Sequence, residues 1–181
     1  MLFKRKTVEP LEFSAEIVIE APASEIYDAL NLRSFDNRYD RRNMQLTPIK
    51  GTNDQFELID PRLPELKTRL TELHAEDGAR YDMKVEFPTD MPAGILTGEE
   101  NSYRIKPLDD DKCAVSCDIV FNTIPVTQTE RREEIPMLMT AVSDDLVRLK
   151  ALIEDGVVAA EKAGALAEIL DFIEALQIAA E

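Results

Sequence analysis

Residues 17–30, which read IVIEAPASEIYDAL, constrain the fold of this chain more than any other segment. Apolar and polar residues alternate up to the Ala-Pro pair, as in a strand that buries one face, and the apolar positions are Phe13, Ala15, Ile17 and Ile19. A helix then begins with Pro22 in its first turn, where the missing backbone N–H costs nothing and the fixed φ suits a helix. The segment therefore predicts a half-buried strand that runs directly into a helix over residues 22–31.

Turn signals divide the rest of the chain into short strands followed by one long helix. After a polar stretch at 33–42 that could hold a short helix, we expect strands at 44–49, 56–59, 66–76, 79–87, 95–107 and 112–122. Asp77-Gly78 is a strong hairpin signal, because a type I′ turn needs positive φ at both positions. Pro125 and Pro136 bracket a connector into a helix over 137–155, whose apolar residues keep helical spacing and which Gly156 ends.

The strand–Ala-Pro–helix junction and this order of elements resemble the START/Bet v 1-like helix-grip superfamily (SRPBCC), and within it the polyketide cyclase/dehydrase-like group, over about residues 10–155. The resemblance implies an α+β fold of order β-α-α-β6-α, in which a seven-stranded curved antiparallel sheet wraps round the long C-terminal helix and leaves a hollow interior. Residues 1–156 would then form one ligand-binding domain. No catalytic residue carries over by motif, and the Trp that many relatives have after the first helix is absent here.

Residues 157–181 exceed the helix-grip plan. Apolar residues recur there at helical spacing, so we expect an extra C-terminal tail helix with one apolar side; they are Leu166, Ile169, Leu170, Ile173, Leu176 and Ala180. That side could pack on its own domain or form a homodimer seam through residues 157–181, and self-association is slightly favoured.

The hairpin turns predict which side chains point inward, since residues that face each other across a hairpin share a face of the sheet. A two-residue turn at Asp77-Gly78 and a three-residue turn at 109–111 give the pairs His74–Tyr81, Glu72–Met83, Tyr103–Cys117, Asn101–Ile119 and Glu99–Phe121. The opposite, outward face carries Asp82, Lys84, Glu86, Arg104 and Lys106. A buried polar group without a partner costs about 1–3 kcal/mol. We therefore expect the inward polar residues to bond one another, line a wet opening or face a cavity.

The predicted site is an interior cavity of at least roughly a few hundred Å³, walled by Tyr81, Met83, Tyr103, Ile119 and Phe121. Further candidate ligand contacts are Asn101, Met91, Leu138 and Val142. If the cavity carries chemistry, the candidate proton-transfer groups are His74 with Glu72 or Glu99, and for each the alternative is a structural role. Four arginines at 33–42 could grip a carboxylate or phosphate, or form a solvated patch balanced by Asp36 and Asp40; they are Arg33, Arg38, Arg41 and Arg42.

Composition excludes several other classes of protein. With 21 basic and 36 acidic residues the net charge of −15 opposes binding to nucleic acid or to an anionic membrane. A single histidine excludes multi-His metal sites, and no nucleotide or hydrolase motif is present, so we expect no metal and no cofactor.

Cys113 and Cys117 would be ~13 Å apart along one strand, too far for a disulfide. The chain has neither a signal-peptide pattern nor a run of about 18 apolar residues, so we expect a cytoplasmic protein.

Three functions fit these features. The first is a carrier or sensor for a small hydrophobic molecule, such as a lipid, polyketide or isoprenoid-like compound, held between the sheet and the helix at 137–155. The second is a cyclase- or dehydratase-like enzyme that uses the acid/base residues of the cavity. The third is a protein-interaction module that works through the tail helix or the acidic surface.

Overall fold

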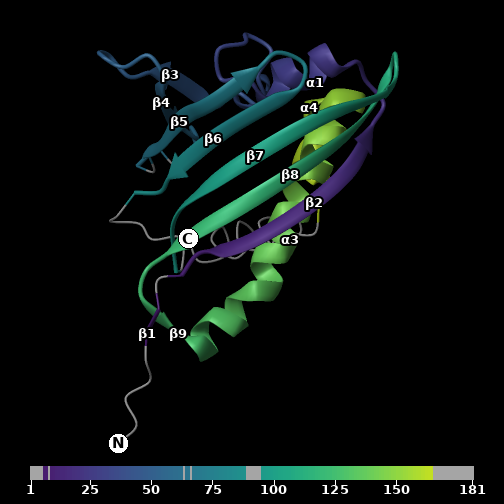
Figure 1. The fold of residues 1–181 in the computed structure, drawn as a ribbon. Coiled ribbons are helices and arrows are strands. Elements are labelled where there is room, and N and C mark those ends of the chain that lie inside the picture. The colour runs from purple at the N-terminus through teal and green to yellow at the C-terminus, as the bar shows by residue number, and fades with distance from the viewer. Residues whose placement is uncertain (1–5, 8, 63, 66, 89–94, 165–181) are drawn as a thin grey trace, which may run out of the picture.

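A computed structural model describes residues 6–7, 9–62, 64–65, 67–88 and 95–164 of the chain (Figure 1). The strands in this part are β1 (Lys6–Thr7), β2 (Leu11–Ile19), β3 (Gln45–Pro48), β4 (Gln55–Ile59), β5 (Lys67–Glu76), β6 (Arg80–Glu86), β7 (Leu96–Asp109), β8 (Lys112–Thr123) and β9 (Val126–Thr127). The helices are α1 (Ala23–Leu30), α2 (Arg38–Arg41), α3 (Gln128–Glu154) and α4 (Val157–Lys162). The predicted α+β class is confirmed.

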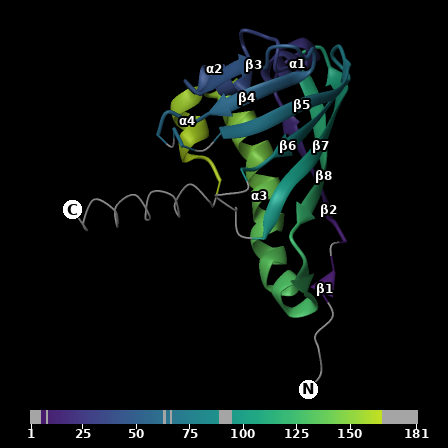
Figure 2. The ribbon, with the colours of Figure 1, turned by 90° about the vertical axis from the view of Figure 1, so that its left-hand side faces the viewer.

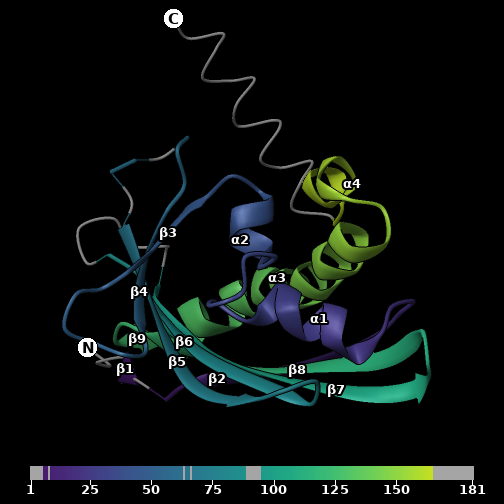
Figure 3. The same cartoon turned by 90° about the horizontal axis from the view of Figure 1, so that it is seen from above.

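Within the described residues, seven strands form one antiparallel sheet in the order β2-β8-β7-β6-β5-β4-β3. The sheet is curved (Figure 1), and α3 runs along one of its faces (Figure 2). Helices α1, α2 and α4 lie on the same side as α3 (Figure 3). The predicted order β-α-α-β6-α and the antiparallel sheet are therefore confirmed. In addition, β1 and β9 form a separate two-stranded pair, which the sequence analysis did not predict.

Helix α3 begins at Gln128, so the predicted start after Pro136 is wrong. Thr127 and Glu130 form a capping box: the Thr127 side chain accepts a hydrogen bond from the Glu130 N–H at 3.3 Å, and Glu130 Oε2 accepts one from the Thr127 N–H at 2.7 Å. Pro136 lies inside the helix rather than at its boundary. Among the helices of the described part, none is both long and apolar enough to cross a membrane.

The end of α3 matches the prediction, because Gly156 adopts φ 88°, a left-handed conformation that favours glycine after a helix. Helix α4 follows at once and packs back against α3. Arg148 Nε donates to the Ala163 carbonyl at 3.1 Å, and Ala160 is buried. Residues 157–164 thus pack on their own domain, whereas the apolar stripe predicted at 166–180 lies outside the described residues.

The core fills the space between the sheet and α3. Apolar residues from the sheet and from α3 belong to this core or pack against it: Ile17, Ile19, Phe56, Leu70, Met83, Val85, Ile105, Ile119, Phe121, Leu138 and Val142. Cys113 and Cys117 are both buried free thiols, and burial raises the pKa of each.

Register shifts decide which predicted pairs form. Between β7 and β8, Asp109 pairs with Lys112, so the predicted three-residue turn at 109–111 is wrong and the connection is one residue shorter. A shift between Pro107 and Asp109 then restores the register, and the three predicted pairs of Glu99, Asn101 and Tyr103 are all observed; a second shift lies between Leu96 and Gly98. Between β5 and β6, Glu76 pairs with Arg80, so the connection is one residue longer than predicted. A β-bulge between Glu72 and His74 then restores the predicted Glu72–Met83 pair.

The prediction that His74 faces inward is therefore wrong. On the hairpin side of the bulge His74 pairs with Asp82 instead of Tyr81, and its side chain is exposed. The longer connection moved every residue between the turn and the bulge to the other face of the sheet.

Candidate functional site

A cavity of about 340 Å³ lies between the inner face of the sheet and helices α2, α3 and α4; we call it the α2–α3 cavity. Its apolar wall comes from strands β4 to β6 and from α3, and it includes Leu58, Leu70, Val85, Phe87, Leu149 and Leu152. Its polar side comes mainly from α2 and α3, and it includes Arg38, Tyr39, Arg42, Glu99, Asp144, Asp145 and Arg148. Thr68 of β5, Ala141 of α3 and Ala160 of α4 complete the lining. The cavity thus combines an apolar wall with a localised group of charges.

The predicted wall residues lie elsewhere in the interior. All five point inward and are at most 4% exposed, but none of them lines the α2–α3 cavity: Tyr81, Met83, Tyr103, Ile119 and Phe121. Leu138 and Val142 of α3 are packed in the same core. These residues belong to the packed core, whereas the lining of the α2–α3 cavity comes mainly from β4, β5 and β6 on the sheet side. Ligand contact by these residues stays a prediction, and Met91 lies outside the described residues.

A buried cluster centred on Arg38 forms one side of the cavity. Asn37 caps α2, since its side chain accepts hydrogen bonds from the backbone N–H groups of Tyr39 and Asp40 at 3.0 Å. Arg38 pairs with Asp145 at 3.0 Å and donates to the Tyr103 hydroxyl at 3.1 Å. The same hydroxyl donates to Asp145 Oδ2 at 2.6 Å. The cluster therefore ties α2 to β7 and α3.

The electrostatics of this cluster keep Arg38 charged and Tyr103 protonated. Burial alone would lower the pKa of Arg38, but Asp145 and Tyr103 raise it well above its usual value. Burial raises the pKa of Tyr103 well above its usual value, so the phenol remains a hydrogen-bond donor. The guanidinium also lies 5.2 and 5.3 Å from the ring centroids of Tyr39 and Tyr103, within the range of cation–π contacts.

Glu99 is the predicted catalytic candidate that the fold brings to the α2–α3 cavity. It is half-buried, and its Oε1 accepts a hydrogen bond from Asn101 Nδ2 at 2.9 Å. Burial raises the pKa of Glu99, and the bond from Asn101 opposes that effect. Asn101 is 2% exposed, and its side-chain oxygen has no hydrogen-bond partner within the described part of the chain. Both residues point inward, as the β7–β8 register predicted.

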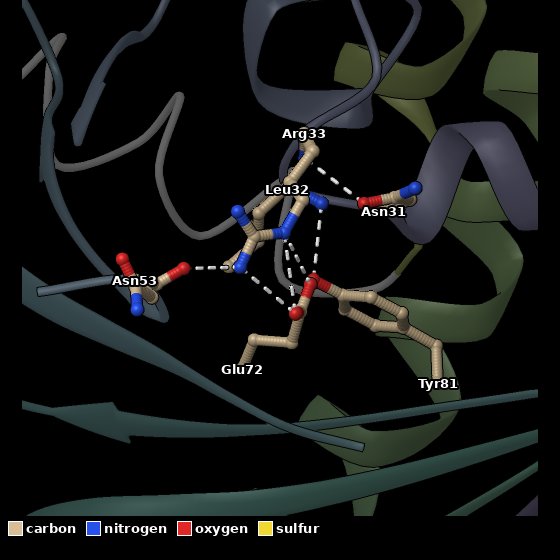
Figure 4. A network of polar contacts seen from close by, with 6 residues as sticks. All are labelled: Asn31, Leu32, Arg33, Asn53, Glu72 and Tyr81. Atoms are coloured by element: carbon tan, nitrogen blue, oxygen red, sulfur yellow. Dashed lines mark hydrogen bonds and ion pairs between the residues drawn. The ribbon is translucent and has the colours of Figure 1, made fainter. Parts of the chain in front are cut away.

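Glu72 also points inward, but it belongs to a different network (Figure 4). Arg33 contacts both of its carboxylate oxygens at 3.0–3.3 Å, and the Tyr81 hydroxyl donates to it at 3.1 Å. The Tyr81 hydroxyl in turn accepts the Leu32 N–H at 3.1 Å, and Arg33 also donates to the Asn53 carbonyl. Glu72 therefore anchors the loop after α1 to the sheet, and it does not line the α2–α3 cavity.

The three catalytic candidates are thus not brought together. His74 is on the outer face, Glu72 is bonded to Arg33 and Tyr81, and Glu99 lines the cavity. Within the described residues, no group of three or more His, Cys, Asp or Glu side chains is placed to hold a metal ion.

Sequence reasoning missed the charged residues of α3. Asp145 precedes the buried Leu149 by four residues, and Arg148 precedes the buried Leu152 by four, so each pair shares one helix face. This spacing to buried leucines could have predicted that both charged side chains lie on the inward face of the long helix.

A wider pocket of about 610 Å³ lies between the α1–α2 loop and strands β3 and β4. Its lining includes Arg33, whose guanidinium is already paired with Glu72 and lies 5.6 Å from the Phe56 ring centroid. We favour the α2–α3 cavity as the functional site because it occupies the interior between sheet and helices and presents buried charges beside an apolar wall.

No protein-family model matches the sequence, and no curated protein matches it by sequence. Solved structures are similar in fold. Norcoclaurine synthase from Thalictrum flavum matches with a TM-score of 0.53 and 12% identity, over 82% of this chain and 98% of that one. Ara h 8.0201 matches with a TM-score of 0.52 and 10% identity, over 74% and 92%. The di-domain ARO/CYC StfQ of the steffimycin biosynthetic pathway matches with a TM-score of 0.57 and 16% identity, over 81% and 52%. The chain therefore shares the fold of these solved structures, a curved antiparallel sheet that wraps round a long C-terminal helix.

Proposed function

We propose that this protein binds a small hydrophobic molecule in the α2–α3 cavity and acts as a carrier or sensor. The observation that carries the proposal is the cavity itself, about 340 Å³ with apolar side chains from both the sheet and α3. Sites for small molecules typically measure about 300–1,000 Å³ and have mostly apolar walls with a few placed polar groups.

The structural neighbours support a small organic ligand. One is named a synthase, and another is an ARO/CYC protein of a biosynthetic pathway. At identities of 12% and 16%, these neighbours share the fold of this chain.

Filling the cavity tests the proposal. Ala141 lies on α3 and lines the cavity, so Ala141→Phe should occupy part of the space without leaving a void elsewhere. Ser143, two residues along the same helix, is exposed, which makes Ser143→Phe the matched control. We expect Ala141→Phe to weaken binding of the apolar fluorophore N-phenyl-1-naphthylamine by about tenfold or more, equivalent to ~1.4 kcal/mol, and Ser143→Phe to leave it unchanged.

Unfolding curves of both variants show whether each one folds. Equal affinity of a folded Ala141→Phe variant and the wild type would place the probe outside this cavity and contradict the proposal. Native mass spectrometry of freshly purified protein would give the mass of any ligand that co-purifies.

Glu99 favours a second candidate function, a cyclase- or dehydratase-like enzyme. A carboxyl group that lines the cavity and has a raised pKa is suited to hold a proton and pass it to a bound molecule. Once a ligand is identified, Glu99→Gln should retain binding and lose turnover if this is correct. Unchanged turnover in Glu99→Gln would remove Glu99 from the chemistry.

A further inference from the structure

Arg42 is a cation of the α2–α3 cavity whose side chain receives no hydrogen-bond partner from the described residues. It follows α2 directly as its C-cap residue and lines the cavity. Its Nε is buried and makes no hydrogen bond. Arg38, four residues earlier, shows the contrast, because its guanidinium is paired with Asp145 and bonded to Tyr103.

The carboxylates that line the same cavity are engaged with other groups. Asp145 accepts hydrogen bonds from both Arg38 and the Tyr103 hydroxyl, and Glu99 accepts one from Asn101. Asp144 is buried directly against Gly164, so closely that a side chain at Gly164 would meet its carboxylate. None of these contacts places a negative charge on Arg42.

Positive charge outweighs negative charge around Arg42, although the Asp60 carboxylate, whose pKa Arg42 helps to lower, is also within electrostatic reach. Burial lowers its pKa, and the charges of Arg148, Arg38 and Arg62 lower it further, opposed by Glu161. Arg148 also lines the cavity, where its Nε donates to the Ala163 carbonyl at 3.1 Å. Two guanidinium groups at one cavity, partly desolvated and repelling each other, would both be stabilised by an anion placed beside them.

We infer that the α2–α3 cavity takes an amphipathic anion, whose apolar body lies on the wall of Leu70, Val85 and Leu152 and whose anionic head is held by Arg42 with Arg148 beside it. The inference rests on the proposed function and narrows its ligand class. A guanidinium presents paired N–H donors that match the oxygens of a carboxylate, sulfonate or phosphate. A neutral molecule of the same body would leave the positive charge of Arg42 unmatched.

Two fluorophores with the same apolar body distinguish the contribution of the anionic group to binding from that of the apolar wall. 1-Anilinonaphthalene-8-sulfonate carries a sulfonate that N-phenyl-1-naphthylamine lacks. Hydrogen bonds to charged groups contribute about 1.5–3 kcal/mol, so the wild type should bind the sulfonate probe about tenfold to a hundredfold more tightly than the neutral one. Arg42→Gln should lower that affinity ratio by about the same factor, and Arg42→Lys should restore part of it.

Arg41→Gln is the matched control, because Arg41 is the neighbouring arginine and does not line the α2–α3 cavity. It should leave the affinity ratio unchanged. Inorganic phosphate at the concentration of the sulfonate probe should not displace that probe, since phosphate has no apolar body to bury.

The outcomes distinguish this inference from the proposed function. A wild-type ratio near one, an equal fall in the ratio for Arg41→Gln and Arg42→Gln, or displacement by phosphate would overturn the inference. The proposed function would still stand if Ala141→Phe weakened the neutral probe. If instead neither probe bound to the wild type, the proposed function and the inference would fail together.

Discussion

Burial acts in opposite directions on two residues of the α2–α3 cavity. It lowers the pKa of Arg42 and raises the pKa of Glu99, so in both cases it disfavours the charged form. Side chains of this kind cost the folded protein stability at neutral pH, and they gather where a site is built for a ligand or for proton transfer. The stability of variants at these two positions therefore tests whether burial in the cavity disfavours their charges.

Glu99→Gln is expected to raise the melting temperature at neutral pH. The pKa of Glu99 in the folded protein lies above its ordinary value of 4.5, so the folded chain binds the proton more tightly than the unfolded chain. The resulting stability is fully present below the unfolded pKa and is lost as pH rises through the folded pKa. Wild type and variant should therefore differ at about pH 7 and converge at about pH 4. Thermal unfolding followed by circular dichroism measures this, and a lower melting temperature for Glu99→Gln at neutral pH would contradict the raised pKa.

Arg42→Gln should also stabilise the ligand-free protein. Because burial and the neighbouring arginines lower the pKa of Arg42, its positive charge is less favourable in the folded state than in the unfolded chain. We expect a small rise in melting temperature for Arg42→Gln and none for Arg41→Gln. A clear fall for Arg42→Gln would show that Arg42 makes a stabilising contact in the folded protein.

At the scale of the elements, local signals predicted most of the fold. Alternating residues and turn residues placed β2 to β8, and the β7–β8 register brought Glu99, Asn101 and Tyr103 inward as expected. The failures came where one local signal competed with another. Pro136 was interpreted as a helix boundary, although the Thr127–Glu130 capping box starts α3 earlier. The β-bulge after Glu72 depends on how β5 pairs with β6, which Asp77-Gly78 alone does not determine.

The network that ties the α1–α2 loop to β5 makes a prediction at this scale. Tyr81→Phe removes the hydroxyl that joins the Leu32 N–H to Glu72, so we expect it to lower the free energy of unfolding by about 1–3 kcal/mol. Tyr27 stacks edge-on against Tyr81 at 6.0 Å between ring centroids, which makes Tyr27→Phe the matched control that keeps the ring contact. Urea unfolding of both variants gives the comparison. An equal fall in the free energy of unfolding for the two variants would show that the hydrogen bonds of the Tyr81 hydroxyl do not stabilise the fold.

At the scale of the whole molecule, the position of the cavity could not be predicted from the sequence. The register found the inward side chains, but an unfilled space depends on how side chains of distant elements pack together. Leu138 and Val142 belong to the packed core, whereas the polar residues of α2 and the Asp145–Leu149 face of α3 line the space toward β4 to β6. That arrangement joins residues more than a hundred positions apart, such as Arg38 and Asp145.

The central claim is that a small hydrophobic molecule occupies the α2–α3 cavity, and methyl NMR during titration with N-phenyl-1-naphthylamine tests it most directly. The account predicts that chemical-shift changes and probe-to-methyl contacts concentrate on Leu70, Val85, Leu149 and Leu152. Changes centred instead on Ile119, Leu138 and Val142 would place the ligand in the part of the interior that is packed here. Either that pattern or changes confined to Leu32 and Leu46 at the α1–α2 loop pocket would contradict the account.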